Sequence, residues 1–253
     1  MKETQVALQL YTIRNLLKTP EDFKKTLPEV RRIGYQAVQT GLGQMETKEL
    51  KKIVECSGLR VIATHIPMER ILGETDSVIE EHKILGAEYV VCPGLPEELH
   101  NADGYRKIAG ELSRAGEVLA RNGLTLGYHN HAIEFERYDG KTGLEILYSE
   151  SDPRYLKVEL DTYWAAYGGA DPAAWCLKYA GRLPLVHVKD LGMKKNKPVF
   201  MEVGEGNLNW EAIIPACRKS GVKWYTVEQD ICLRHPLESA KISLENLRKM
   251  GIE

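Results

Sequence analysis

The strongest constraint on the fold is a repeated order of elements: an amphipathic helix, a glycine, then a short apolar strand. Five glycines follow predicted helices in this way, namely Gly34, Gly58, Gly86, Gly123 and Gly221. A glycine just beyond a helix accepts the left-handed conformation that ends it. Strands that alternate with helices at this spacing are parallel and are joined by crossovers. The sequence therefore predicts an α/β protein.

The same pattern predicts eight strands, at about Val6–Leu10, Tyr35–Val38, Arg60–Thr64, Tyr89–Cys92, Leu124–Tyr128, Leu156–Leu160, Pro184–Val188 and Trp224–Val227. Eight units in 253 residues match a closed (β/α)₈ TIM barrel. An open doubly wound sheet is the alternative, but no Gly-x-Gly-x-x-Gly follows the first strand. No linker divides the chain, so we expect residues 1–253 to form one domain.

Composition narrows the classes of partner. The net charge is −2, and the densest basic cluster, residues 194–197, is expected at a solvated loop tip. This balance argues against nucleic-acid and membrane-surface partners. The five cysteines lack C-x-x-C spacing, which is typical of reduced thiols, and no uncharged stretch is long enough to span a bilayer. We expect a soluble, cytoplasmic protein with a small-molecule substrate, and its aromatic-bearing loops are compatible with a homo-oligomer.

Polar residues gather where the predicted strands end, which is where TIM barrels place their active sites. Taken singly, each has a structural explanation, such as a hydrogen-bonded histidine or a capping aspartate. Their concentration is the signal, because five of the seven histidines lie at or near strand ends: His65, His129, His131, His187 and His235. The other two, His82 and His100, are expected on the surface.

Carboxylates and imidazoles in this arrangement suit Mn²⁺, Mg²⁺, Co²⁺ or Zn²⁺, whereas the lack of thiolate spacing argues against a closed structural zinc site. A metal with open positions would polarise a substrate carbonyl and stabilise an enediolate while a carboxylate moves the proton. Hydroxyl-rich substrates also need hydrogen-bond partners and an apolar wall, which Lys189, His65 and Trp164 can supply. The sequence therefore predicts a metal-dependent enzyme acting on a small carbohydrate.

At these residues the chain resembles the xylose isomerase-like TIM barrels, the superfamily of sugar phosphate isomerases and epimerases that includes inosose dehydratases and endonuclease IV. The resemblance covers essentially the whole chain. It rests on the motifs Leu8–Arg14, Tyr128–Phe135, Leu160–Trp164, Val186–Asp190, Val203–Gly206 with Trp210, and Val227–Asp230.

The resemblance implies one divalent ion held by a Glu, Asp, His, Glu quartet from strands five to eight. Asp161, His187 and Glu228 match three of these ligands. The strand-five position departs from the pattern, because His129 or His131 stands at the strand end and Glu134 follows in the loop. We expect Glu134 to be the fourth ligand, with His129 as the alternative.

By the same resemblance, Glu134 and Glu228 would be the acid/base pair of an isomerase or epimerase for a sugar, keto sugar or polyol. Lys189 would polarise or protonate a substrate oxygen. If a histidine is the second base, a dehydratase or lyase acting on a keto sugar or keto-inositol is the alternative. The expected substrate contacts are Tyr11, His65, His129, His131 and Trp164.

Two other classes of function stay open on this fold. A hydrolase of abasic DNA would need a richer zinc ligand set and a basic groove, and the charge of −2 argues against it. A non-catalytic sugar-binding barrel could keep the polar strand ends without a competent metal site. No Gly-rich phosphate cradle is evident, so a phosphorylated substrate has no specific support.

Overall fold

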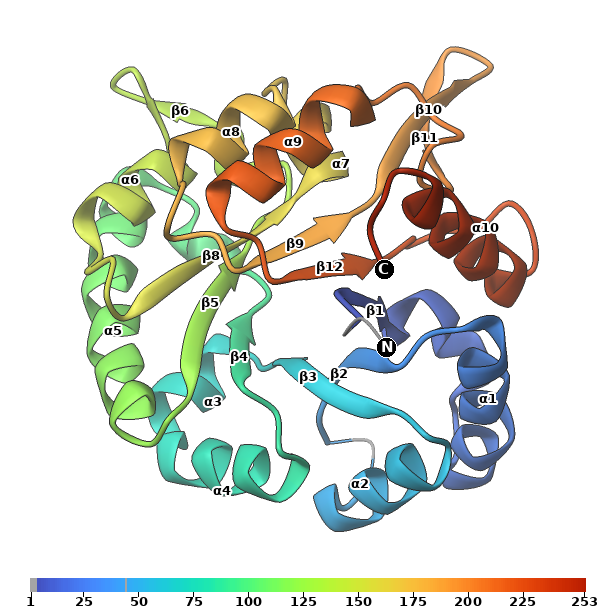
Figure 1. Cartoon of the computed structure of the whole chain (residues 1–253). Coiled ribbons are helices and arrows are strands. Elements are labelled where there is room, and N and C mark those ends of the chain that lie inside the picture. The colour runs from blue at the N-terminus through green and yellow to red at the C-terminus, as the bar shows by residue number, and fades with distance from the viewer. Residues whose placement is uncertain (1–3, 44) are drawn as a thin grey trace.

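In the computed structural model, which describes residues 4–43 and 45–253, eight parallel strands close into a barrel in the order β1-β12-β9-β8-β5-β4-β3-β2. Figure 1 views this barrel with its helices arranged around it. The predicted (β/α)₈ fold is confirmed. The barrel strands are β1 (Val6–Gln9), β2 (Ala37–Gly41), β3 (Arg60–His65), β4 (Tyr89–Cys92), β5 (Thr125–His129), β8 (Leu156–Asp161), β9 (Leu185–Val188) and β12 (Trp224–Val227).

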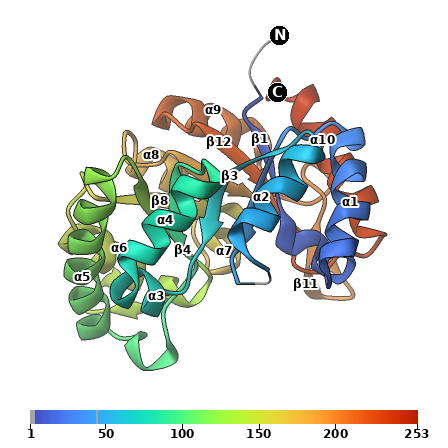
Figure 2. The same ribbon diagram turned by 90° about the horizontal axis from the view of Figure 1, so that it is seen from below.

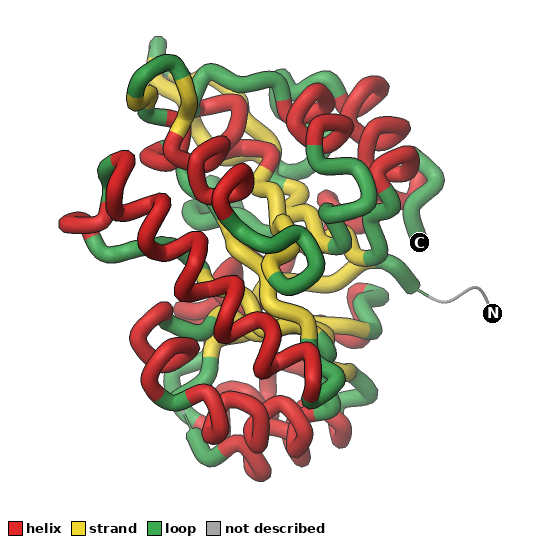
Figure 3. Tube along the Cα trace, turned by 90° about the vertical axis from the view of Figure 1, so that its left-hand side faces the viewer, coloured by secondary structure: helices red, strands yellow, loops and turns green. Residues whose placement is uncertain are grey.

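Helices cover the outside of the strands, as the side view in Figure 3 shows. They are α1 (Pro20–Ile33), α2 (Thr47–Cys56), α3 (Met68–Gly73), α4 (Thr75–Leu85), α5 (Ala102–Arg121), α6 (Gly143–Glu150), α7 (Thr162–Tyr167), α8 (Pro172–Lys178), α9 (Trp210–Ser220) and α10 (Pro236–Lys249). Short 3₁₀ turns span Leu10–Leu16, Glu97–Leu99 and Ile133–Phe135. Among the described residues, no helix is both long enough and apolar enough to cross a membrane.

Side-chain caps fix where several helices begin. The Thr19 hydroxyl accepts from the Asp22 backbone N–H at 3.2 Å, and the Asp22 carboxylate accepts in return from the Thr19 backbone N–H at 3.0 Å. Asn209 accepts from the Ala212 N–H at 3.2 Å at the start of α9. Such caps satisfy N–H groups that have no partner inside the helix. Thr19 and Asn209 therefore mark where α1 and α9 begin.

Two antiparallel hairpins interrupt the β/α alternation and were not predicted. One pairs β6 (Arg137–Tyr138) with β7 (Lys141–Thr142), and the other pairs β10 (Asp190–Lys194) with β11 (Lys197–Met201). The tip of the second hairpin holds Lys195 and Asn196 at φ 48° and 59° and is exposed, so the basic cluster lies at a loop tip as expected. Because no glycine marks this turn, the usual sequence signal for a hairpin is missing there.

The interior of the barrel is apolar at one end of its axis and polar at the other. A small apolar cluster that includes Ala7, Ala37, Ala63 and Leu185 fills one end. Side chains two residues apart on a strand face the same side. Residues two positions further along these strands, Gln9, Gln39, His65 and His187, therefore extend the interior toward the carboxyl ends. The polar half of the barrel is where the site forms.

The chain closes on itself at the opposite end of the strands. The Gln5 backbone N–H, just before β1, donates to the Glu253 backbone oxygen. Figure 2 shows the start of β1 beside the C-terminal end of the chain. The segment after α10 therefore lies against the first strand, away from the polar half of the barrel.

His82 corrects one sequence expectation, because it is fully buried rather than on the surface. Its Nδ1 lies 2.7 Å from the Val78 carbonyl oxygen, one turn earlier on α4. Its Nε2 lies 2.7 Å from the Thr64 hydroxyl on β3. A carbonyl only accepts, so Nδ1 carries the proton and Nε2 accepts from Thr64. Both ring nitrogens are satisfied in the neutral form, and burial lowers the pKa of His82.

Candidate metal centre

The polar residues inside the barrel form two levels. The deeper level holds Gln39, His65 and Glu159, and the outer level holds Asp161, Glu228 and Lys189. Glu159 and Asp161 are two residues apart on β8, so both side chains point inward, one above the other. Two further histidines, His129 at the end of β5 and His187 on β9, lie between the levels and contact both.

Glu159 is the centre of the deeper level and is completely buried. Its Oε2 lies 2.8 Å from His65 Nε2, 3.2 Å from His129 Nδ1 and 3.2 Å from His187 Nε2. Its Oε1 accepts from Gln39 Nε2 at 2.9 Å. Burial raises the pKa of Glu159, but the neighbouring histidines outweigh burial and hold that pKa well below its usual value. The carboxylate therefore stays charged and orients the rings around it.

Gln39 bridges Glu159 and His187 by hydrogen bonds and so orients the His187 ring. Because a carboxylate only accepts, the Gln39 amide must turn its NH₂ toward Glu159 and its oxygen toward His187. The Gln39 Oε1 to His187 Nε2 distance is 2.8 Å, so Nε2 carries a proton. The other ring nitrogen, Nδ1, donates to the Glu228 carboxylate at 2.9 Å, and it is the nitrogen that would bind a metal ion after losing this proton. Such outer hydrogen bonds are typical of metal-binding histidines.

The outer level contains a set of groups suited to a divalent ion. One ligand atom each from His129, Asp161, His187 and Glu228 can be chosen so that all lie within 4.8 Å of one another. A second such group, which shares His129 and His187, includes His65 and Glu159. The buried Asp161 Oδ2 makes no hydrogen bond of good geometry and is held by its ion pair with Lys189 Nζ at 3.0 Å. This oxygen and the two imidazoles fit a Zn²⁺- or Mn²⁺-type ion.

Lys189 is the cation of this level and is 1% exposed. Its Nζ lies 2.8 Å from Glu228 Oε2 and 3.0 Å from both Asp161 Oδ2 and Asp230 Oδ2. The Thr162 hydroxyl accepts from its backbone N–H at 3.0 Å, which fixes the strand end that carries it. Burial by itself lowers the pKa of Lys189, but the three carboxylates outweigh burial and raise that pKa above its usual value. The side chain is an ammonium.

The electrostatics of the other groups follow from burial and charge. Burial raises the pKa of Asp161 to about 6, against the opposing effect of Lys189. Burial lowers the pKa of His187, but Glu159 and Glu228 reverse this and raise it to about 10. Burial also lowers the pKa of His131, which favours a neutral ring.

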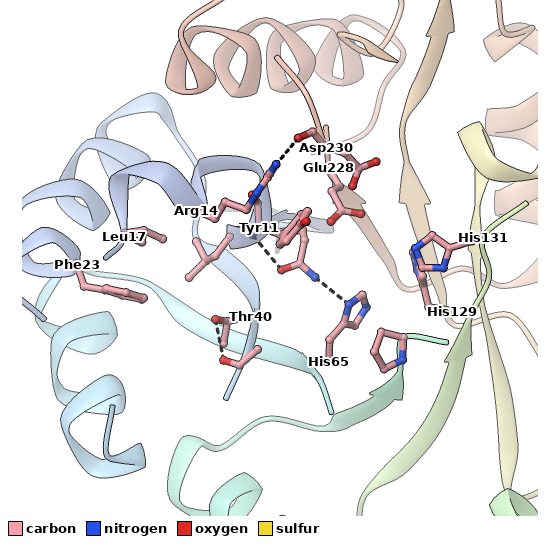
Figure 4. Close-up of a pocket in the computed structure, with 14 residues that line it drawn as sticks. Tyr11, Arg14, Leu17, Phe23, Thr40, His65, His129, His131, Glu228 and Asp230 are labelled. Atoms are coloured by element: carbon pink, nitrogen blue, oxygen red, sulfur yellow. Dashed lines mark hydrogen bonds between the residues drawn. The ribbon is translucent and has the colours of Figure 1, made fainter. Parts of the chain in front are cut away.

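A cavity of about 340 Å³ opens onto this centre. Figure 4 shows His129 and His131 on one side, facing His65, with Glu228 and Asp230 above. Tyr11 and Arg14 lie over the middle, and the apolar side chains of Leu17 and Phe23 lie at the far end. The Arg14 guanidinium stacks 4.0 Å above the Tyr11 ring and donates to the Asp230 backbone oxygen at 2.8 Å. The cavity therefore joins a charged end to an apolar end.

Half of the predicted site residues line this cavity. Of the expected substrate contacts, Tyr11, His65, His129 and His131 line the cavity. Trp164 lies behind this wall, with its ring centroid 5.5 Å from that of His131 and 5.7 Å from Lys189 Nζ. The predicted ligands Asp161, His187 and Glu228 lie together in the outer level.

Glu134 lies elsewhere. Its Oε1 accepts from the Tyr128 hydroxyl at 2.7 Å and its Oε2 from the His131 backbone N–H at 2.8 Å. It is fully buried and belongs to neither group of metal-capable residues among those described. In this position it holds the turn that carries His131. The structure brings His129, rather than Glu134, to the strand-five corner of the group.

Glu159 and Gln39 stand at predicted strand ends, yet the sequence assigned neither of them a role. The period of two along β8 was the available signal for Glu159, because it places this residue on the face of Asp161. For Gln39 the available local signal was only its position at a predicted strand end. Its partner Glu159 is distant in sequence and is reached only when the barrel closes.

The fold and this centre together define a TIM barrel with a polar cluster at the carboxyl ends of its strands. Residues 27–250 match the family model described as xylose isomerase-like TIM barrel. The chain belongs to this family.

Among curated proteins, the chain is 25% identical over 270 residues to the rhizopine catabolism protein MocC of Rhizobium meliloti, covering 90% of this chain and 81% of that protein. It is 23% identical over 261 residues to an inosose dehydratase of Bacillus cereus (strain AH820), covering 86% of each chain. A solved structure of a sugar phosphate isomerase/epimerase from Parabacteroides distasonis ATCC 8503 superposes with a TM-score of 0.83 at 26% identity, covering 100% of this chain and 96% of that one.

Proposed function

We propose that the protein is a divalent-metal-dependent enzyme that removes the proton beside the carbonyl of a keto sugar or keto-polyol and then eliminates a hydroxyl as water. The observation that carries this proposal is the group His129, Asp161, His187 and Glu228, with the Lys189 ammonium against two of its carboxylates. The relatives named inosose dehydratase and sugar phosphate isomerase/epimerase support a sugar or polyol as substrate.

In this proposal His129, Asp161, His187 and Glu228 hold the ion. Asp161 Oδ2, which is held by its ion pair with Lys189, supports the assignment. So does His187 Nδ1, which Gln39 turns toward Glu228. Bound there, the ion would supply Lewis acidity, which favours ionisation of the carbon next to the substrate carbonyl. Glu134, the ligand first expected, would then be a positioning residue for the His131 turn.

The remaining chemistry belongs to side chains. His131 lines the cavity and its lowered pKa leaves the ring neutral, so it can take the proton from carbon. The bond electrons move into the carbonyl system, and as the carbonyl reforms they expel the hydroxyl on the next carbon. Lys189 gives that hydroxyl a proton, so it leaves as water. The proton on His131 returns to Lys189 through solvent, which leaves the protein unchanged and the substrate one water lighter.

Epimerisation or isomerisation is the second candidate, and the shared cavity favours it. Glu228 and His131 both line the cavity, and two acid/base groups facing one carbon can remove a proton and return it on the other side. Here the pair would be Glu228 and His131 in place of Glu134 and Glu228. We rank elimination first because Lys189 offers an acid distinct from the base.

One incubation tests both candidates. The metal-loaded protein is mixed with keto sugars and a keto-inositol in D₂O, and products are followed by NMR and mass spectrometry. Loss of one water with a new carbon–carbon double bond supports elimination, whereas deuterium incorporated without loss of water supports epimerisation. Neither change with any substrate of these classes would refute the proposed chemistry and favour a sugar-binding barrel instead.

A further inference from the structure

The ion pairs that the Lys189 ammonium makes with neighbouring carboxylates conflict with a bound metal ion. An ammonium has three protons, and three carboxylates lie within 3.0 Å of Nζ: those of Asp161, Glu228 and Asp230. With 1% exposure, Lys189 has almost no water to replace any of these partners. Its position is therefore set by the three carboxylates.

Two of the three carboxylates belong to the candidate ligand group. A metal ion binds carboxylate oxygens at about 2.0–2.2 Å and would use Asp161 Oδ2 and Glu228 Oε2, the oxygens that Nζ now contacts. A divalent ion and an ammonium on the same oxygens would repel one another strongly in a buried site. Both cannot keep these contacts at once.

The third carboxylate offers an alternative position. Asp230 belongs to neither metal-capable group found among the described residues, and its side chain is 21% exposed and lines the cavity. The rings of Trp164 and Phe200, with centroids 5.7 and 5.9 Å from Nζ, give the ammonium aromatic neighbours as well. The side chain of Lys189 is long and unbranched, so it can keep its contact with Asp230 while leaving the other two oxygens.

We propose that Lys189 is the counter-ion of the metal-free centre, and that an entering divalent ion displaces its ammonium from Asp161 and Glu228 toward Asp230. This inference rests on the proposed function, because it assumes that the group binds metal. It adds that Lys189 and Asp230 set the metal affinity without being ligands. It also places the ammonium toward the substrate cavity only when the ion is bound, so the proton donor and the metal ion are brought into position together.

The test is metal affinity, measured without reference to turnover. Zn²⁺ and Mn²⁺ are titrated into chelator-treated protein by calorimetry, with a competing chromophoric chelator for tight binding. Lys189→Met removes the competing cation and should bind the ion more tightly, by roughly 5- to 150-fold. Asp230→Asn removes the carboxylate toward which the ammonium is displaced, and this variant should bind the ion more weakly than wild type. In the double variant, the Asp230→Asn change should have no further effect.

Lys157→Met is the matched control. Lys157 lies on the same strand β8, four residues before Asp161, and its Nζ donates to the Pro153 carbonyl oxygen at 2.7 Å. Removing this charge should leave metal affinity unchanged. Should Lys189→Met fail to fold without metal, Asp230→Asn decides the matter, because its side chain is partly exposed and its loss leaves Lys189 with two carboxylates.

The outcomes separate this inference from the proposed function. Tighter binding by Lys189→Met and weaker binding by Asp230→Asn support the displacement. Two results would overturn the displacement while leaving metal dependence standing, provided that the wild-type protein binds one ion. The first is a Lys189→Met variant that binds the ion equally or more weakly than wild type. The second is an Asp230→Asn variant that binds it equally or more tightly. A wild-type protein and variants that all fail to bind Zn²⁺ and Mn²⁺ would overturn the metal-dependent function as well.

Discussion

Replacing Glu159 by glutamine tests whether the deeper level of the centre prepares the metal ligands. Glutamine keeps the size of the side chain but turns one accepting oxygen into a donating NH₂. If that NH₂ replaces Oε1, it faces the Gln39 NH₂, and Gln39 must rotate its amide. Gln39 would then present its NH₂ to His187 Nε2, so Nε2 could no longer carry a proton and the ring would keep its proton on Nδ1, the nitrogen that a metal needs.

If the NH₂ replaces Oε2 instead, three histidine nitrogens within 3.2 Å lose their acceptor. In either orientation a ligand histidine is left with the wrong tautomer or without its partner. Loss of such outer partners typically costs 10- to 100-fold in metal affinity, which is about 1.4 to 2.8 kcal/mol. We therefore expect Glu159→Gln to bind Zn²⁺ more weakly by about this factor.

The assay is competition for Zn²⁺ with a chromophoric chelator, alongside far-UV circular dichroism to check the fold. Glu134→Gln is the matched control, since Glu134 is an equally buried carboxylate outside the metal-capable groups. It should lower the free energy of unfolding by about 1–3 kcal/mol through one lost hydrogen bond, and leave affinity unchanged. Equal affinity in Glu159→Gln and wild type would refute the reasoning. A large loss in Glu134→Gln would instead make Glu134 the ligand first expected.

Three further outcomes follow from the structure. Asp161→Ala and Glu228→Gln should each abolish turnover while circular dichroism stays that of the wild type; full activity in either variant would contradict the assigned centre. Asp190→Asn should lower the free energy of urea unfolding by about 1–3 kcal/mol, because five N–H groups donate to the Asp190 carboxylate. An unchanged urea midpoint would show that these hydrogen bonds do not stabilise the fold. The pKa of folded His82 lies below 6.5, so the unfolded chain binds the extra proton and stability falls as the pH drops below about 6.5. The destabilisation caused by His82→Gln should therefore be smaller at about pH 5.5 than at about pH 7.5, whereas a loss that is independent of pH would contradict burial of a neutral ring.

The sequence was sufficient for the architecture because each strand is bounded by local signals. Glycines and capping residues such as Thr19 and Asn209 mark the helix ends, and short apolar, β-branched-rich runs mark the strands. Barrel closure then requires the strand ends to meet, so residues such as Asp161, His187 and Glu228 could be expected together from the sequence alone.

The sequence did not show how deeply each polar side chain is buried or which residues it faces. Glu134 and Glu159 are both buried glutamates near strand ends, yet one holds a turn and the other orients three histidines. The difference arises from which residues closure of the barrel brings opposite them. His82 illustrates the same limit, since its buried ring contacts Thr64 on β3, which the local pattern of α4 does not reveal.

The measurement that tests the central claim most directly is elemental analysis of the purified protein, followed by incubation with keto sugars in D₂O in the presence of the metal found. The account predicts one divalent ion per chain, and proton abstraction beside the carbonyl, seen as deuterium at that carbon or as loss of water. Chelation of the ion should stop both. A protein that carries no ion, gains none on titration and leaves every keto substrate unchanged would contradict the account.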